Sequence, residues 1–310
     1  MRLDESQQSQ NLEDLRDQGG GGFSSGGMGG MPIPGGRGGL GIIGIVVLFL
    51  IGKGLGIDPS ILINGAQLLL GGGGGYDSSQ MIPQPAPQAS GGAPSDESGR
   101  FISAVLANTE QVWGTVLPQQ TGKSYPQPKL VLYRNETPTA CGPGQRSAGP
   151  FYCPLDQKVY LDLGFFDDMQ RQFGVRMGRF AIAYVVAHEI GHHIQNVLGT
   201  LPKVEAAQRS AGSRESNALQ VRVELQADCF AGVWAANADQ RFKIIEQGDV
   251  EDALKAAASV GDDTLQKETQ GYVVPDSFTH GSSEQRTRWF SNGLKTGQIS
   301  ACNTFNANPL

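Results

Sequence analysis

Apolar residues recur at intervals of three and four through most of the chain after residue 100, the spacing of one face of an α-helix. Two shorter segments, residues 129–133 and 159–163, are rich in apolar and aromatic residues and are typical of strands. Few strands and many helices indicate an α+β domain over residues 100–310, mainly helical with a small β-sheet. Helices are predicted for residues 101–117 (closed by Pro118), 165–173, 177–198, 214–237 and 243–259, and after His280, where Ser282 and Gln285 fit a capping box.

The first hundred residues lack this periodicity. More than half of the 44 glycines of the chain lie between residues 19 and 75. Residues 1–37 are polar and then glycine-rich, and they hold too few apolar side chains to offset the conformational entropy lost on folding, so we predict disorder. Residues 58–99 are rich in Gly, Pro, Ser and Gln, a composition typical of a flexible tether.

An apolar run, GGLGIIGIVVLFLIG, lies between these two segments and is flanked by Arg37 and Lys53. With residues 54–57 it forms a segment of about 20 residues, long enough to cross a membrane as a helix. A signal peptide would begin nearer the N-terminus, and a buried core helix would not be bordered by so many glycines. We therefore predict a single-pass transmembrane signal anchor at residues 38–57, with the N-terminus in the cytoplasm and the catalytic domain on the periplasmic or extracellular side.

Composition excludes several classes of protein. The net charge of −6 and the lack of basic clusters argue against a nucleic-acid partner, because phosphate contacts need a basic surface. The four cysteines are too few for a disulfide scaffold and lack the CxxC spacing of zinc fingers and thioredoxin-like proteins. What remains is a globular domain that follows an unusual N-terminal third.

The strongest chemical signal is the segment HEIGHH at residues 188–193. His188 and His192 are four apart, so on a helix both imidazoles project from the same face and can bind one ion. Zinc suits imidazole nitrogen, and Glu189 is placed to take a proton from a water in the open coordination position. Chance matches to HExxH are common, but two histidines and a carboxylate on an apolar helix are costly to bury without a function. His193 is rotated off this face and is expected to be only a polar neighbour.

A third ligand has to come from another segment. In VELQADCFA, residues 223–231, Glu224 and Asp228 are also one helical turn apart. Two antiparallel helices joined by a loop at residues 200–213 would bring Glu224 opposite the histidines. Asp228 could then accept a hydrogen bond from the second nitrogen of a ligand histidine. The alternative, a solvated acidic face, is weakened by the apolar residues on both sides.

The HEIGHH helix, the ELQADCFAG segment and the later THGSSEQRTRWF segment together resemble the bacterial neutral zinc metallopeptidases over about residues 98–305. That family is similar to the gluzincins, in which HExxH is completed by the glutamate of an ExxxD motif. The resemblance implies a zincin-like fold, a peptide or protein substrate and one zinc ion per chain. It implies zinc ligands at His188, His192 and Glu224, a general base at Glu189, an orienting carboxylate at Asp228 and an oxyanion-stabilising His280.

Three functions are compatible with these residues: a membrane-anchored zinc metallopeptidase, a zinc-dependent hydrolase of a non-protein amide, and a tethered binding module with a structural zinc site. Glu189 counts against the third, because a structural site has no use for a base. The first two share the same attack on a carbonyl carbon. In a peptidase, residues 159–163 are expected to border the cleft and to pair with an extended peptide. Arg286 could pair with Asp228 or Glu224.

The four cysteines predict two disulfide bonds if the domain is exported. Cys141 and Cys153 share one Gly/Pro-rich loop, and closing so short a loop costs little entropy. Cys229, next to Asp228, would then pair with Cys302 and hold the C-terminal segment on the ligand helix. The alternative is that Cys229 is an unpaired, buried residue.

Overall fold

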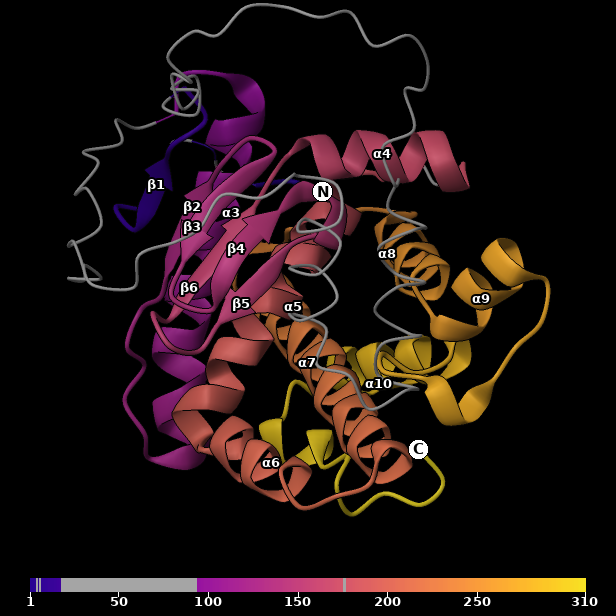
Figure 1. Ribbon diagram of the computed structural model, residues 1–310. Coiled ribbons are helices and arrows are strands. Elements are labelled where there is room, and N and C mark those ends of the chain that lie inside the picture. The colour runs from indigo at the N-terminus through magenta and orange to yellow at the C-terminus, as the bar shows by residue number, and fades with distance from the viewer. Residues whose placement is uncertain (4, 6, 18–93, 175–176) are drawn as a thin grey trace, which may run out of the picture. The chain divides into compact units, whose positions relative to one another are not determined.

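The computed structural model describes residues 1–17 and 94–310, except residues 4, 6, 175 and 176 (Figure 1). The chain divides into two compact units, one formed by Met1–Ser24 with Gly91–Leu310 and the other by Ser25–Ser90. All described residues belong to the first unit, and the structure below is that of this unit alone.

Short strands and longer helices make up this unit, in agreement with the predicted α+β class. The strands are β1 Leu12–Asp14, β2 Lys129–Leu132, β3 Glu136–Thr139, β4 Gly142–Gln145, β5 Phe151–Cys153 and β6 Lys158–Leu161. The helices are α3 Glu97–Thr121, α4 Gly164–Phe173, α5 Arg179–Leu198, α6 Thr200–Gln208, α7 Ser213–Phe242, α8 Asp249–Ser259, α9 Asp262–Gln270 and α10 Ser283–Thr296. Short 3-10 turns are η1 Arg146–Ala148, η2 Pro275–Ser277 and η3 Ile299–Cys302. Figure 1 shows the sheet on one side of α5 and α7, and α8 and α9 on the other.

The main sheet has the strand order β1-β2-β6-β5, and β1 pairs with β2 in parallel. The prediction that residues 1–37 are disordered is therefore wrong for their described part. Leu12 is buried, and Met1 and Leu3 pack against the same core. A segment with few apolar residues folds here because it adds those residues to a core that the rest of the domain has already formed. Such a contribution leaves no periodic pattern in the segment itself.

The predicted localisation also needs correction. Within residues 1–17 and 94–310, no helix is long and apolar enough to cross a membrane. The predicted span, residues 38–57, lies outside the described residues. In addition, Leu12 is paired with Leu130 in one sheet, and a single crossing between them would place the two strands on opposite sides of a membrane. The single-pass anchor is therefore not supported.

Strand β6 lies inside the sheet. It pairs with β2 in parallel on one side and with β5 in antiparallel orientation on the other. The expectation that residues 159–163 form an open edge for a peptide is therefore wrong, because both edges of β6 are already hydrogen-bonded. Strand β5 had not been predicted, since its three residues are too few to show alternation. It is the edge of the described sheet on this side.

The predicted helices are present with altered ends. Pro118 lies within α3 and does not end it, because the missing N–H removes a single hydrogen bond in the last turn. The helix stops at Gly122, whose positive φ of 72° favours glycine. The capping box of Ser282 and Gln285 at the start of α10 is confirmed. Helices α6 and α9 had been missed, and α6 occupies most of the predicted 200–213 loop.

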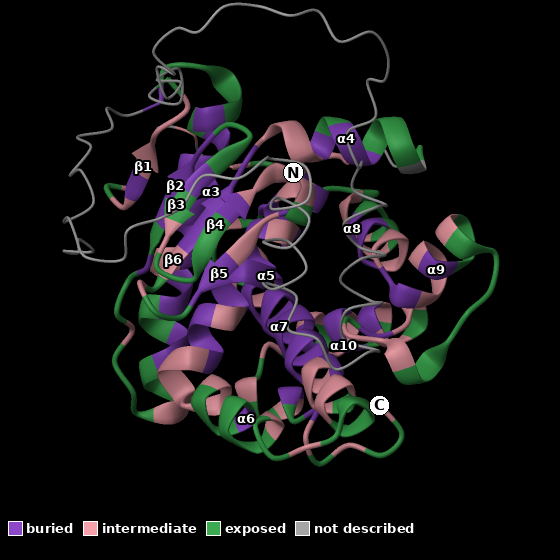
Figure 2. Cartoon of the chain, viewed as in Figure 1, coloured by how far each residue is buried: buried purple, intermediate pink, exposed green. Residues whose placement is uncertain are grey.

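Helices α5 and α7 cross closely at Gly191. A Cβ atom at this position would lie 2.9 Å from the backbone oxygen of Ala227, so only glycine fits without movement of the helices. The middle of each helix is buried, as Figure 2 shows. This contact brings the HEIGHH segment against the ELQAD segment, as the sequence predicted.

Both predicted disulfide bonds are present. Cys141, in the turn between β3 and β4, is bonded to Cys153 at the end of β5. Cys229 of α7 is bonded to Cys302, which lies 73 residues later in η3. The second bond fastens the C-terminal turn to the helix that carries Glu224.

Candidate metal centre

Three side chains from two helices converge where α5 and α7 meet. His188 and His192 come from α5 and Glu224 from α7, and one ligand atom of each lies within 4.8 Å of the others. Glu224 Oε2 is 3.2 Å from His188 Nε2 and 3.6 Å from His192 Nε2. All three side chains are nearly enclosed, with exposed fractions of 8%, 13% and 10% respectively. The structure thus brings together the three residues that the sequence suggested as ligands.

His188 is held by a carboxylate behind it. Its Nδ1 lies 2.8 Å from Asp228 Oδ1, which also accepts a hydrogen bond of 2.5 Å from the hydroxyl of Tyr184. Burial lowers the pKa of His188, but the carboxylates of Asp228 and Glu224 outweigh burial and raise it to about 10. The surroundings of the imidazole therefore favour a cation, either a proton or a metal ion. Tyr184 is one turn before His188, a spacing that could have singled it out in the sequence.

Arg286 of α10 supports this carboxylate from the other side. Its Nε donates to Asp228 Oδ2 at 2.9 Å, and its Nη2 donates to Asp228 Oδ1 at 2.9 Å. The sequence left Asp228 and Glu224 open as partners of Arg286, and in the structure the partner is Asp228. Burial alone would raise the pKa of Asp228, but Arg286 and His188 lower it to about 2. Asp228 is therefore an ionised, fully buried anchor that links α5, α7 and α10.

The other two ligands are also supported. His192 Nδ1 lies 2.9 Å from Gln195 Oε1, and Gln220 Nε2 donates to Glu224 Oε1 at 2.9 Å. Each ligand thus has one atom directed to the centre and a second atom hydrogen-bonded elsewhere, the arrangement that fixes ligands in metal sites. Neither glutamine was predicted, because a neutral amide on a helix carries no pattern that separates it from any other polar residue.

Glu189 differs from these carboxylates. It is buried, with 7% of its surface exposed, yet it makes no hydrogen bond or ion pair with any described residue. Burial raises its pKa, and the neighbouring His192 and His188 offset part of that effect. A buried carboxyl group with a raised pKa, and with no hydrogen-bond partner in the described part of the chain, is suited to hold and release a proton.

The residues present fit a zinc ion. Two imidazole nitrogens and one carboxylate oxygen form a donor set typical of catalytic zinc, with three protein ligands and a fourth position for water or substrate. The backing of each ligand by a hydrogen bond matches the same class of site. His188, His192 and Glu224 would hold the ion.

His280 lies apart from this compact centre, in the connection between α9 and α10, with 51% of its side chain exposed. Asp262, at the start of α9, holds the segment: its Oδ2 accepts hydrogen bonds from the backbone N–H groups of Thr279, His280 and Gly281. Its Oδ1 lies 3.2 Å from His280 Nδ1. Asp262 was not predicted, since it is 18 residues from His280 and belongs to no motif.

His193 is a fully buried structural residue, consistent with its expected place off the ligand face. The hydroxyl of Tyr152 lies 3.0 Å from His193 Nδ1, and His193 Nε2 lies 2.6 Å from the carbonyl oxygen of Pro126. A carbonyl oxygen can only accept, so Nε2 carries the proton and Nδ1 accepts from Tyr152. The pair fastens strand β5 to helix α5.

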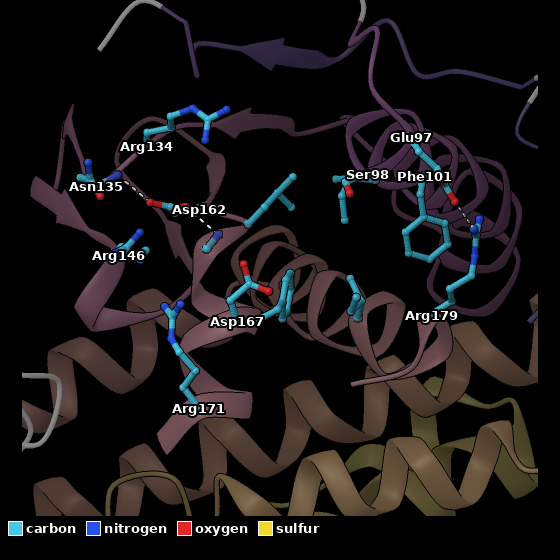
Figure 3. Close-up of a pocket in the computed structure, with 15 residues that line it drawn as sticks. Glu97, Ser98, Phe101, Arg134, Asn135, Arg146, Asp162, Asp167, Arg171 and Arg179 are labelled. Carbon is cyan, nitrogen blue, oxygen red and sulfur yellow. Dashed lines mark hydrogen bonds and ion pairs between the residues drawn. The ribbon is translucent and has the colours of Figure 1, made fainter. Parts of the chain in front are cut away.

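A cavity of about 600 Å³ lies where β2 and β6 end, near the start of α5 (Figure 3). It is lined in part by Arg134, Asp167, Arg179 and Ile182. Ile182 is seven residues before Glu189, nearly two helical turns, so both lie on one face of α5 about 10 Å apart. Arg134 makes no side-chain hydrogen bond or ion pair within the described part of the chain.

Comparisons with known proteins identify the family of the chain. A family described as "Putative neutral zinc metallopeptidase" matches residues 1–305. The protein YpfJ of Escherichia coli K12 is 54% identical over 210 residues, which is 68% of this chain and 72% of that protein. The protein Rv2575 of Mycobacterium tuberculosis H37Rv is 42% identical over 228 residues, which is 69% of this chain and 74% of that protein. No solved structure matches. The chain belongs to the neutral zinc metallopeptidase family.

Proposed function

We propose that this protein hydrolyses peptide bonds in a zinc-dependent reaction, with His188, His192 and Glu224 as ligands and Glu189 as general base. The observation that carries the proposal is the difference between Glu189 and the three proposed ligands, all of which are buried or nearly so. Each of the three ligands has its second polar atom bonded to a neighbour. Glu189 has no such partner among the described residues, so its carboxylate is available to a reacting water.

A zinc ion bound at these ligands would supply Lewis acidity toward water and a substrate carbonyl. Glu189 would take the proton of the attacking water and deliver it to the leaving nitrogen, for which its raised pKa is suited. His280 would donate a hydrogen bond through Nε2 to the developing oxyanion in its protonated form, in which Nδ1 donates to Asp262. Burial lowers the pKa of His280, but Asp262 and Glu224 outweigh burial and raise it, which favours this form. Asp228 keeps the proton of His188 on Nδ1, which leaves Nε2 free to act as a ligand.

The substrate main chain would add to the free edge of β5. An edge strand offers unpaired N–H and C=O groups to an extended peptide. Tyr152 of β5 is bonded to His193, the residue after ligand His192, so this edge is fixed relative to the metal centre. A substrate-analogue complex without main-chain hydrogen bonds to residues 151–153 would contradict this placement.

The cavity beside Arg134 would receive a substrate side chain on one side of the cleaved bond. Arg134 lines the cavity, and its guanidinium group has no partner among the described residues. We therefore expect a preference for an acidic side chain at this position of the substrate. Replacement of Arg134 by alanine should remove that preference and leave cleavage of other peptides unchanged. An unchanged preference would exclude this cavity as the recognition site.

A structural zinc site in a binding module is a weaker explanation, because it assigns no role to a buried, unpartnered Glu189. Hydrolysis of a non-protein amide uses the same chemistry and differs only in substrate. A digest of a peptide library by the purified protein, with and without a chelator, tests the proposal. We expect cleavage that the chelator abolishes and added zinc restores. No cleavage by the zinc-loaded protein, with Glu189→Gln as the matched blank, would contradict peptidase activity.

A further inference from the structure

A continuous chain of hydrogen bonds joins ligand His192 to the C-terminal turn. From His192 Nδ1 it passes to Gln195 Oε1 at 2.9 Å, and from Gln195 Nε2 to Gln226 Oε1 at 3.1 Å. Gln226 Nε2 then donates to the carbonyl oxygen of Cys302 at 2.9 Å. Gln195 and Cys302 are almost completely buried, and Gln226 is 8% exposed, so water competes little for these bonds.

The direction of every bond in this chain is determined. The carbonyl oxygen of Cys302 can only accept, so the amide nitrogen of Gln226 faces Cys302 and its oxygen faces Gln195. Gln195 Nε2 also donates to the carbonyl oxygen of Val223 at 2.7 Å. With both donors of Gln195 in use, its oxygen faces His192, whose Nδ1 must carry the proton. His192 is left with a bare Nε2 toward Glu224, the form that binds a metal.

The far end of the chain is fixed by a covalent bond. Cys302 is bonded to Cys229 of α7, the helix that also carries Glu224 and Gln226. Thr304, just beyond, is fully buried and donates through Oγ1 to the carbonyl oxygen of Arg222 at 2.6 Å. These two contacts hold the C-terminal turn against α7, so that the carbonyl group of Cys302 can orient Gln226.

We propose that Gln195, Gln226 and the turn held by the Cys229–Cys302 bond are positioning elements of the metal centre, which keep His192 in its metal-binding form and slow the loss of zinc. The inference rests on the proposed zinc site. Gln195 contacts the ligand directly and has the largest effect. The carbonyl group of Val223 also orients Gln195, so Gln226 and the disulfide have smaller effects.

The experiment measures the rate at which zinc leaves the purified, zinc-loaded protein in excess chelator. Gln195→Met, which keeps the side-chain length without its hydrogen bonds, should release zinc about 10–100-fold faster than the wild type. Gln226→Met, and the double replacement Cys229→Ser with Cys302→Ser, should each accelerate release several-fold.

Two matched controls test whether loss of any disulfide or any hydrogen bond of the C-terminal segment accelerates zinc release. Cys141→Ser with Cys153→Ser removes a disulfide whose Cys153 packs among Val131, Tyr133 and Tyr160, in a cluster that contains none of the ligands. Asn237→Ala removes a hydrogen bond of 3.0 Å from α7 to the carbonyl oxygen of Gly297, also in the C-terminal segment but outside the chain of bonds. Neither control should change the rate of zinc release.

A double-mutant cycle gives the decisive result. If the disulfide acts through Gln195, then loss of Cys229 and Cys302 in the Gln195→Met background should add nothing to the release rate. Additive effects, or controls that accelerate release equally, would overturn the inference while leaving the zinc site in place. A wild type that retains no zinc would overturn the zinc site and this inference together. Gln226→Met breaks no covalent bond and keeps the test valid if the cysteine variants fail to fold.

Discussion

The metal-ligand cluster and the His280 segment are the two parts of the proposed active site, and they are built in different ways. His188, His192 and Glu224 come from two long helices in close contact, and none is more than 13% exposed. His280 comes from the connection between α9 and α10, is 51% exposed, and depends on the single carboxylate of Asp262. Helix packing fixes the ligands before a metal arrives, whereas the position of His280 is set by a local loop contact.

The difference indicates which changes the site tolerates. A ligand on a helix cannot shift without moving α5 or α7, so a change there should affect metal content or stability. His280 lies outside the core, so a change there should lower turnover and leave the metal content unchanged. The predictions below test this division, from the largest expected effect to the smallest.

Glu189→Gln should lower kcat/KM by at least about 1,000-fold, because only proton transfer and water orientation are removed. Zinc content should remain that of the wild type, since Glu189 is not a proposed ligand. Activity is measured on a peptide found in the library digest, and zinc by elemental analysis of the same sample. A variant that keeps activity would remove Glu189 from the mechanism.

Asp228→Ala should lower the free energy of unfolding by about 3–5 kcal/mol, because it leaves the buried guanidinium group of Arg286 unpaired. Denaturant titration of the metal-free protein measures the loss. The double variant Asp228→Leu with Arg286→Met should regain part of the stability, since both charges are then gone. If Asp228→Ala loses no more stability than the double variant, the pairing of Asp228 with Arg286 does not anchor the helices.

His280→Ala should lower kcat about 100-fold, the usual cost of one oxyanion donor, with zinc content unchanged. Thr279→Ala is the matched control, because Thr279 contacts His280 Nδ1 at 3.1 Å and not the reacting side of the ring. Its kcat should stay close to the wild-type value. Zinc loss in His280→Ala would contradict the separation of the two regions.

Asp262 should contribute stability that depends on pH. Burial raises its pKa, but His280 and the backbone N–H groups of the segment outweigh burial and lower the pKa below its ordinary value. A carboxyl group with a lowered pKa stabilises the fold above its unfolded-state pKa, and this contribution is lost as pH falls. Asp262→Asn should therefore be about 1–2 kcal/mol less stable than the wild type at pH 6. In metal-free protein at pH 3, the difference in stability between Asp262→Asn and the wild type should be smaller. A difference that does not change with pH would contradict a stabilising role for ionised Asp262.

The residues on helices could be predicted because helical periodicity places them in space. The four-residue spacings of His188 with His192, and of Glu224 with Asp228, fix which side chains share a face. Gln195 and Gln220 lie three and four residues from the ligands that they contact, each in the same helix as its ligand, but a neutral amide at this spacing is too common on helices to be singled out. Asp262 was missed because its partners lie 17 to 19 residues away, in a loop near α10.

The sheet was less predictable than the helices. Strands β1 and β5 have three residues each, too short for alternation to show, and β1 comes from a segment whose composition indicated disorder. Their partners are far away in sequence, so pairing depends on the finished fold. Because β5 was not predicted, β6 was expected to offer an edge to a peptide, whereas β5 already pairs with it there.

The central claim is that His188, His192 and Glu224 hold a zinc ion that Glu189 does not ligate. Elemental analysis of purified wild type, Glu224→Ala and Glu189→Gln tests this most directly. We predict about one zinc per chain in the wild type and in Glu189→Gln, and a large loss in Glu224→Ala. Full zinc occupancy in Glu224→Ala, or a wild type that binds no zinc, would contradict the account.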